Sequence, residues 1–318
     1  MRPEAVTATV LWTTMAWAQE GATHSPILAA ISVEPDSGKS TLLGVLRFLV
    51  PKPFVSVEPT GPSVYRTVDR EHPTLIIDEA DDLFYRKSDL RAIVNAGWSR
   101  GTRIPRQGRW YDPFCPKILG ILGKTKLPRT IASRSIILKM WPKKPDEKAE
   151  DFAYADDAEF STIRRKLARW ASDNVRIIKD LKPPQPPGFN NRLSANWKLP
   201  LQIAQHAGGG WPEQASRSAI YLSRTPTAAT SSARVPSVSD DDAQNWRCRW
   251  GRVAEIWGAD RKVVASRLCA LRASTSAVRQ TDRLRGAAHP VVNIRTSPTE
   301  ASLDGLRELG QIKAHYLK

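Results

Sequence analysis

The run Ser37–Thr41 reads Ser-Gly-Lys-Ser-Thr and stands between two apolar stretches. The first stretch, Ile27–Ile31, predicts a buried strand, and the second, Leu42–Leu49, has helical spacing. A strand, a tight turn and a helix bind phosphate, because the N–H groups of the turn and the positive end of the helix face the anion. The Lys39 ammonium would add a point charge, and the Ser40 hydroxyl would hold magnesium. The predicted phosphate-binding residues are Asp36, Ser37, Gly38, Lys39, Ser40 and Thr41.

A second pair of residues could complete this chemistry. Asp78 and Glu79 follow an apolar stretch, so they are predicted to stand at the carboxyl end of a buried strand. There Asp78 could hold the magnesium through water, and Glu79 could polarise the attacking water as general base. The alternative is an ordinary strand that ends in solvated acids. Such phosphate loops usually carry glycine five residues before Gly38, where this chain has Val33.

Arginine is the third candidate group. Arg134 precedes the last predicted strand and could reach the nucleotide of a neighbouring subunit as an arginine finger, which is worth about 10³–10⁵ in rate. A structural ion pair within the subunit is the alternative. Lys124 and Thr125, at the end of the preceding strand, could sense the γ-phosphate, although an exposed turn explains them as well.

The segment 98–111 places an arginine at every third position between aromatic ends. Guanidinium groups pair with phosphates and aromatic rings stack on bases, so this pattern predicts a contact with single-stranded nucleic acid. A solvated basic loop is the alternative. The predicted contact residues are Arg100, Arg103, Arg106 and Arg109.

These residues need a sheet to position them. Apolar runs predict strands that alternate with helices, which is typical of an α/β fold with a doubly wound, mostly parallel sheet. The predicted strands are 27–33, 54–57, 74–81, 117–122 and 135–140, and the predicted helices are 5–19, 42–49, 62–68, 89–97, 161–181, 192–206 and 211–222. We expect a nucleotide-binding core over 1–145, a small helical lid over 146–223, and a poorly ordered or atypical tail over 224–318.

The composition indicates which kind of binding partner and which cellular compartment to expect. The chain has 318 residues, a formal net charge of +16 and a pI near 10, which favours a polyanion such as nucleic acid as partner. Its three cysteines are far apart and lack metal-ligand spacing, so a disulfide framework and a zinc site are not expected and a reducing cytoplasm fits. No apolar run reaches the length of a membrane span, and the apolar N-terminal stretch reads as a packed helix.

With these residues assembled, the chain resembles a family of uncharacterised P-loop ATPase domains of unknown function, found in bacterial, phage and plasmid proteins beside primase or helicase modules. The resemblance spans about residues 5–223 and includes SPILAAISVEPDSGKSTLL, HPTLIIDEADDLF, LRAIVNAGWSRG, PKILGILGKTKLPRTIASRSI, RRKLARWASDN and NNRLSANWKLPLQIAQHAGGGWPEQA. It implies an ATPase core of the additional-strand, catalytic-glutamate class and a role in DNA replication or in maintenance of a mobile element. It also implies that Lys39, Ser40, Asp78 and Glu79 form Walker A and Walker B motifs, with Arg134 as the arginine finger.

The sequence therefore predicts a magnesium-dependent ATP hydrolase, helicase-like or of the loader type, that acts on single-stranded or duplex DNA, could form a homo-oligomeric ring and could work with a primase or another replication protein. One alternative is a regulatory or remnant protein that binds ATP without productive hydrolysis. Another is a small-molecule phosphotransferase, which would be indifferent to DNA.

Overall fold

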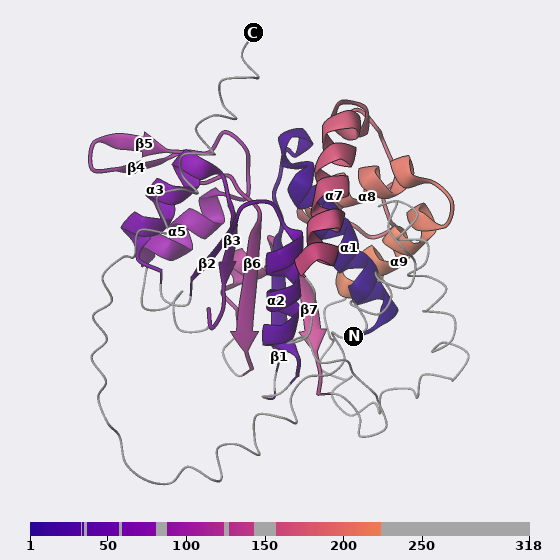
Figure 1. Ribbon diagram of the computed structural model, residues 1–318, viewed down its shortest axis with the longest axis horizontal. Coiled ribbons are helices and arrows are strands. Elements are labelled where there is room, and N and C mark those ends of the chain that lie inside the picture. The colour runs from indigo at the N-terminus through magenta and orange to yellow at the C-terminus, as the bar shows by residue number, and fades with distance from the viewer. Residues whose placement is uncertain are drawn as a thin grey trace. The chain divides into compact units, whose positions relative to one another are not determined.

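The computed structural model describes residues 1–32, 34, 37–56, 59–80, 88–123, 127–142 and 157–223, all within the first of two units, residues 1–275. Among them, a parallel five-stranded sheet has the order β2-β3-β6-β1-β7 (Figure 1). The strands are β1 (Ile27–Ser32), β2 (Pro53–Ser56), β3 (Thr74–Ile77), β6 (Lys117–Leu122) and β7 (Ser135–Met140). Strand β6 lies between β1 and β3, so the strands that lead to the two candidate motifs are not neighbours.

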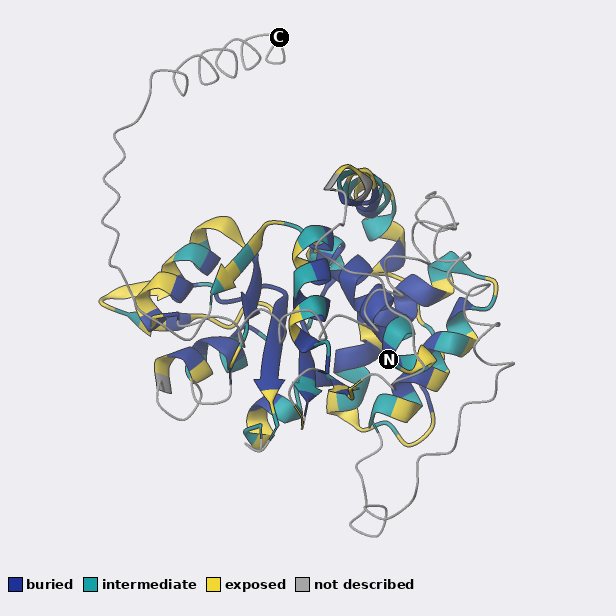
Figure 2. Ribbon diagram, turned by 60° about the horizontal axis from the view of Figure 1, so that its bottom comes forward, coloured by how far each residue is buried: buried dark blue, intermediate teal, exposed yellow. Residues whose placement is uncertain are grey.

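Helices cover both faces of the sheet, because alternate residues of its central strands enter different apolar clusters. In β1, Leu28 and Ala30 join a cluster with α2 (Lys39–Leu49), while Ile27 and Ala29 join a second cluster on the opposite face. The second cluster contains residues of α3 (Gly61–Glu71), α5 (Ser88–Ala96) and α6 (Arg129–Ala132). Figure 2 shows the middle of the sheet in dark blue, as buried, whereas the edge strand β2 is partly exposed. The fold is therefore α/β with a parallel sheet covered on both faces, as predicted.

The N-terminal helix α1 (Pro3–Trp17) packs with the helices that follow the sheet in sequence. Its core residues, among them Trp12 and Met15, share one cluster with α7 (Asp157–Ile178), α8 (Asn191–Ala207) and α9 (Trp211–Ser223). Trp12 is fully buried, and its Nε1 donates to the carbonyl of Pro26, directly before β1. A short 3₁₀ helix, η1 (Gln19–Gly21), connects α1 to the sheet. The predicted packed N-terminal helix is thus confirmed.

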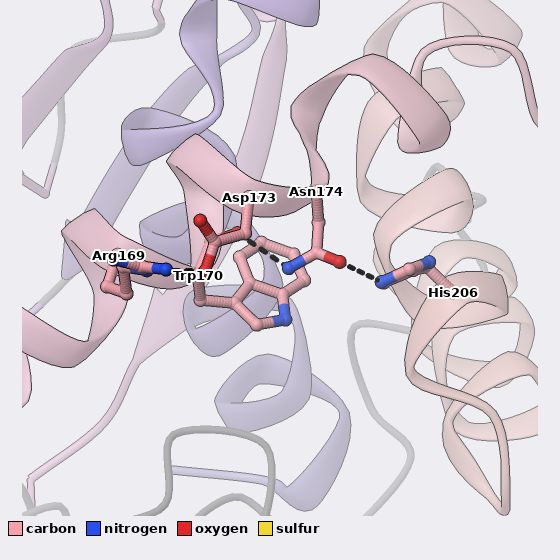
Figure 3. Close-up of polar contacts among 5 residues, drawn as sticks. All are labelled: Arg169, Trp170, Asp173, Asn174 and His206. Carbon is pink, nitrogen blue, oxygen red and sulfur yellow. Dashed lines mark hydrogen bonds and ion pairs between the residues drawn. The ribbon is translucent and has the colours of Figure 1, made fainter.

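Polar contacts tie α7 to α8 (Figure 3). Asn174 donates from Nδ2 to the carbonyl of Trp170, and its Oδ1 lies 2.9 Å from Nε2 of His206 on α8. On the outer side of α7, Arg169 and Asp173 form an exposed ion pair of 2.6 Å. None of the helices within the described ranges is long and apolar enough to cross a membrane.

A two-stranded antiparallel ribbon lies outside the main sheet. Strands β4 (Ile104–Arg106) and β5 (Arg109–Tyr111) meet at Gln107 and Gly108, which both have positive φ, +51° and +74°. Two successive residues of positive φ make the turn that matches the twist of a tight hairpin. Ile104 and Tyr111 are buried against α3 and α5, whereas the opposite pair, Pro105 and Trp110, faces solvent. Residues 104–111, part of the segment 98–111 predicted to contact nucleic acid, therefore form a hairpin with one apolar face.

Candidate functional site

The turn before α2 places the start of an eleven-residue helix close to the carboxyl end of β1. Gly38 caps this helix with φ +77° and ψ 15°, a left-handed conformation that glycine adopts without strain. Its carbonyl accepts the first helical hydrogen bond, from the N–H of Leu42 at 3.0 Å. Ser37 and Lys39 are buried although both are polar, and Thr41 lies in the first turn of the helix. Asp36 and Val33, as well as Lys124 and Thr125, lie outside the described residues.

Lys39 and Ser40 both reach the carboxylate of Asp78. The Lys39 Nζ lies 3.7 Å from Asp78 Oδ1, and the Ser40 Oγ donates to Asp78 Oδ2 at 3.4 Å. The Lys39 side chain is only 10% exposed, so its ammonium is held close to the carboxylate with little access to water. The structure thus brings together Lys39, Ser40 and Asp78, three of the predicted site residues.

Gly120, on β6, leaves room for the Asp78 carboxylate to approach Lys39 and Ser40. This room is needed because β6 lies between β3 and β1. A Cβ atom on Gly120 would lie 2.3 Å from Asp78 Oδ1 and 2.9 Å from Leu43 Cδ2. Both distances are shorter than any ordinary contact, so a side chain at position 120 would push the Asp78 carboxylate and the end of the Leu43 side chain away from their present positions. Gly120 is not among the site residues predicted from the sequence. Its signal was a lone glycine within an apolar strand, which often marks a close approach.

Glu79 has an unusual backbone conformation. Its φ is +54°, which is uncommon for a residue with a side chain, and strain of this kind gathers at functional sites. Its N–H donates to Asp78 Oδ1 at 3.0 Å, while the next N–H, of Ala80, bonds to the carbonyl of Gly120 at 2.9 Å. The predicted strand 74–81 therefore ends at Ile77, because the left-handed residue interrupts the extended backbone. The Glu79 side chain is exposed.

The donor set suits a magnesium ion that also binds phosphate. Magnesium prefers oxygen ligands and is usually held by one or two carboxylates, water and substrate phosphates. Ser40 Oγ and Asp78 Oδ2 supply two such oxygens 3.4 Å apart at the start of α2. Among the described residues there is no cluster of three or more acidic, histidine or cysteine side chains that could hold a metal without a substrate. The two oxygens of Ser40 and Asp78 therefore fit a magnesium ion whose other ligands are water and phosphate oxygens.

Arg134 lies at the other end of the strands. It directly precedes β7, and its carbonyl accepts from the N–H of Ile27 at the amino end of β1. Its guanidinium lies 5.4 Å from the ring centre of Trp98 and donates to the carbonyl of Thr130 at 2.7 Å. Arg134 is thus not brought to Lys39 and Asp78 within one subunit, and the arginine-finger role stays a prediction about a neighbouring subunit.

Three of the four arginines predicted to contact nucleic acid hold the protein itself together. Arg100 donates to the carbonyls of Gln19, Glu20 and Ala22 and lies over the Phe114 ring. Arg106 pairs with Asp89 at 3.0 Å, and Arg109 pairs with Asp69 at 3.1 Å, which fixes the hairpin to α5 and α3. Arg103 is exposed, with no such contact among the described residues. The contact of these arginines with nucleic acid stays a prediction, and the neighbouring Trp110 is 61% exposed.

Comparison with known proteins gives one family match. Residues 139–247 match the model of a protein family of unknown function, DUF3631. The described part of this span holds the end of β7 and the helices α7, α8 and α9. It excludes the phosphate turn and Asp78, so the match concerns the helical part of the chain.

Solved structures of JCV helicase are also similar to the chain at a low level. One, described as the X-ray structure of JCV helicase, has a TM-score of 0.30 and 13% identity, and the match covers 82% of this chain and 67% of that one. An inhibitor-bound structure of the same helicase gives 0.30 and 12% over the same shares. No protein of curated function matches the chain.

Proposed function

We propose that this protein is a magnesium-dependent ATPase, helicase-like or of the loader type, that acts on DNA in replication or in maintenance of a mobile element. The observation that carries the proposal is the contact of both Lys39 and Ser40 with Asp78. Three residues from two distant motifs thereby meet beside the amino end of a helix, where an anion is stabilised. The alternative, an ordinary strand that ends in solvated acids, would explain neither the buried lysine beside Asp78 nor the glycine that leaves room for the Asp78 carboxylate.

Each residue has a distinct role in this proposal. Lys39 would neutralise charge on the β- and γ-phosphates, and the N–H groups at the start of α2 would hold the phosphate oxygens. Ser40 and Asp78 would hold Mg²⁺, which supplies charge neutralisation on the phosphates when bound. The carboxylate of Glu79, exposed beside Asp78, would orient and deprotonate the attacking water.

The strand order supports the same class of ATPase. Strand β6 stands between the strand before the phosphate turn and the strand before the acidic pair, so it is an additional strand between the two motifs. Glu79 would then be the catalytic glutamate. The division into core, lid and tail remains part of the proposal, although α1 packs with the helices of the expected lid.

The DNA partner is proposed from charge. The net charge of +16 favours a polyanion, the solvent face of the hairpin offers Trp110 for stacking, and the exposed Arg103, directly before β4, could meet a phosphate. A ring of several copies would be required if Arg134 acts on a neighbour's nucleotide. A primase or other replication partner and a cytoplasmic location belong to the same proposal.

The direct experiment measures ATP hydrolysis by the full chain with Mg²⁺, with and without single-stranded DNA. We expect turnover that DNA stimulates, that Lys39→Ala abolishes through lost ATP binding, and that Glu79→Gln abolishes while ATP still binds. Tight ATP binding without turnover in the wild type would favour the regulatory or remnant alternative. Turnover that requires a small-molecule acceptor and ignores DNA would favour a phosphotransferase.

A further inference from the structure

We propose that Arg134 and Arg192, whose guanidinium groups both lie close to the Trp98 ring, form a binding site for the phosphate backbone of single-stranded DNA. The site lies at the amino ends of the strands, where Arg134 precedes β7. It is separate from the nucleotide site at the carboxyl ends, where Asp78 follows β3. The inference rests on the proposed function for its partner, DNA, but not for the ATP chemistry.

Trp98 is the centre of a basic cluster. The guanidinium of Arg134 lies 5.4 Å and that of Arg192 5.5 Å from the centre of its ring, and the His24 ring lies 4.3 Å away. The indole Nε1 donates to Asn196 Oδ1 on α8 at 2.8 Å, which fixes the ring. Because the indole is already in contact with these four side chains, the cluster offers cations to a ligand rather than a free stacking surface.

Neighbouring polar groups hold the two arginines in place. Arg192 donates from Nη1 to Ser133 Oγ at 3.0 Å, and Asn196 donates to the carbonyl of Ser133 at 3.1 Å. Arg134 donates from Nη1 to the carbonyl of Thr130, and its Nη2 makes no hydrogen bond within the described part of the chain. Its Nε is buried and is therefore closed to a ligand. The Nη2 donor of Arg134 thus remains for a ligand, on a guanidinium group whose position is already set.

The charges of the cluster are not balanced. Neither Arg134 nor Arg192 contacts a carboxylate within the described residues, whereas Arg106 and Arg109, for example, each pair with an acid. Burial, and then the charge of Arg192, lower the pKa of Arg134. Two guanidinium groups beside one indole thus repel each other, and a bound anion would relieve that repulsion.

The surface beside Arg192 is shaped to admit such an anion. A shallow open depression is lined by Ser133, Asn190, Asn191 and Arg192. Asn190 caps α8 through its side chain, so the positive end of this seventeen-residue helix faces the same depression. The depression is open rather than enclosed, which suits one segment of a long polyanion better than a small molecule that needs enclosure.

The test measures binding of a labelled single-stranded oligonucleotide to the full chain without ATP, by fluorescence anisotropy over a range of salt. Each phosphate contact on a single strand contributes about 0.7 to the slope of log affinity against log salt. We expect the double variant Arg134→Gln with Arg192→Gln to reduce that slope by about 1.4 and to weaken binding by roughly tenfold or more in low salt.

The control removes the same charge elsewhere. Arg169 (Figure 3) and Arg217 are exposed arginines on helices, each in an ion pair with an acid one turn away. The double variant Arg169→Gln with Arg217→Gln should keep the wild-type slope. A double Arg→Lys variant at 134 and 192 keeps the charge and should bind nearly as the wild type does, which separates lost contacts from misfolding. Arg192→Gln alone, at an exposed position, should lower the slope by about 0.7.

Two results would overturn the proposal. One is an unchanged slope in a folded Arg134→Gln, Arg192→Gln protein, or an equal loss in the control. The other is unchanged DNA binding together with lost ATP turnover, because that outcome would assign the arginines to the nucleotide of a second copy. Absence of any ATP turnover in the wild type would contradict the proposed ATPase but would leave the DNA measurement intact.

Discussion

Gly120→Ala should disable the nucleotide site although it replaces no residue proposed to bind nucleotide or metal. The added Cβ would lie 2.3 Å from Asp78 Oδ1, whereas ordinary contacts begin at 3.4 Å, so the carboxylate must retreat by about 1 Å. The 3.4 Å contact between Ser40 Oγ and Asp78 Oδ2 would then be lost. A misplacement of about 1 Å in a catalytic site costs about 10²-fold in rate.

The assay is Mg²⁺-dependent ATP hydrolysis together with unfolding in urea. We expect turnover to fall about 10²-fold, and stability to fall by about 1–3 kcal/mol, the usual cost of overpacking. In an Asp78→Ala background the clashing oxygen is absent, so the same glycine substitution should destabilise the protein less. Gly210→Ala, where the new Cβ would meet only the tip of Gln214 at 3.1 Å, is the control. Wild-type turnover in Gly120→Ala, or an equal loss of stability in both backgrounds, would refute the role given to Gly120.

Three further predictions concern the backbone, pH and the core. Glu79→Gly should be at least as stable as the wild type in urea, since glycine adopts φ +54° without strain. The variant should nevertheless not hydrolyse ATP. A clear loss of stability would instead mean that the Glu79 side chain has a structural role. Burial, and then Lys198, lower the pKa of His24 below 6.5, so its contribution to stability is fully present above that pH and declines as the pH falls through the folded pKa. His24→Gln should therefore flatten the pH dependence of unfolding below about pH 6.5, and an unchanged profile would assign that dependence to other groups. Lys117→Ala should destabilise the protein by about 2–5 kcal/mol in urea, because Lys117 Nζ is buried and donates to the carbonyls of Gly97 and Cys115 at 2.6 Å. A smaller loss would mean that the residues around position 117 close the cavity left by the substitution.

The sheet could be predicted from the sequence because its strands are short apolar runs between breakers. The predicted strands 117–122 and 135–140 coincide with β6 and β7. Their order could not be derived from hydropathy, because the position of β6 between β1 and β3 depends on pairing between distant segments. The predicted strand 74–81 extends beyond the end of β3, since nothing in the residue type of Glu79 reveals a left-handed backbone.

The sequence predicted which residues form the candidate site, but not the neighbouring residue that lets them come together. Lys39, Ser40 and Asp78 could be found from motif spacing, whereas the need for Gly120 arises only when two strands and a helix meet. The pattern of arginines at every third position misled in a different way. Arg106 and Arg109 find acids on helices that are distant in sequence, so their role depends on tertiary contacts that a local pattern cannot show.

ATP turnover by Glu79→Gln is the most direct test of the proposal that Glu79 is the general base of an ATPase. We expect the wild type to hydrolyse ATP with Mg²⁺. The variant should bind ATP as tightly but turn it over about 10²–10⁴-fold more slowly, because the general base is lost while the phosphate site around Lys39 is intact. Full turnover in the variant, or no turnover in the wild type with ATP bound, would contradict the proposed ATPase.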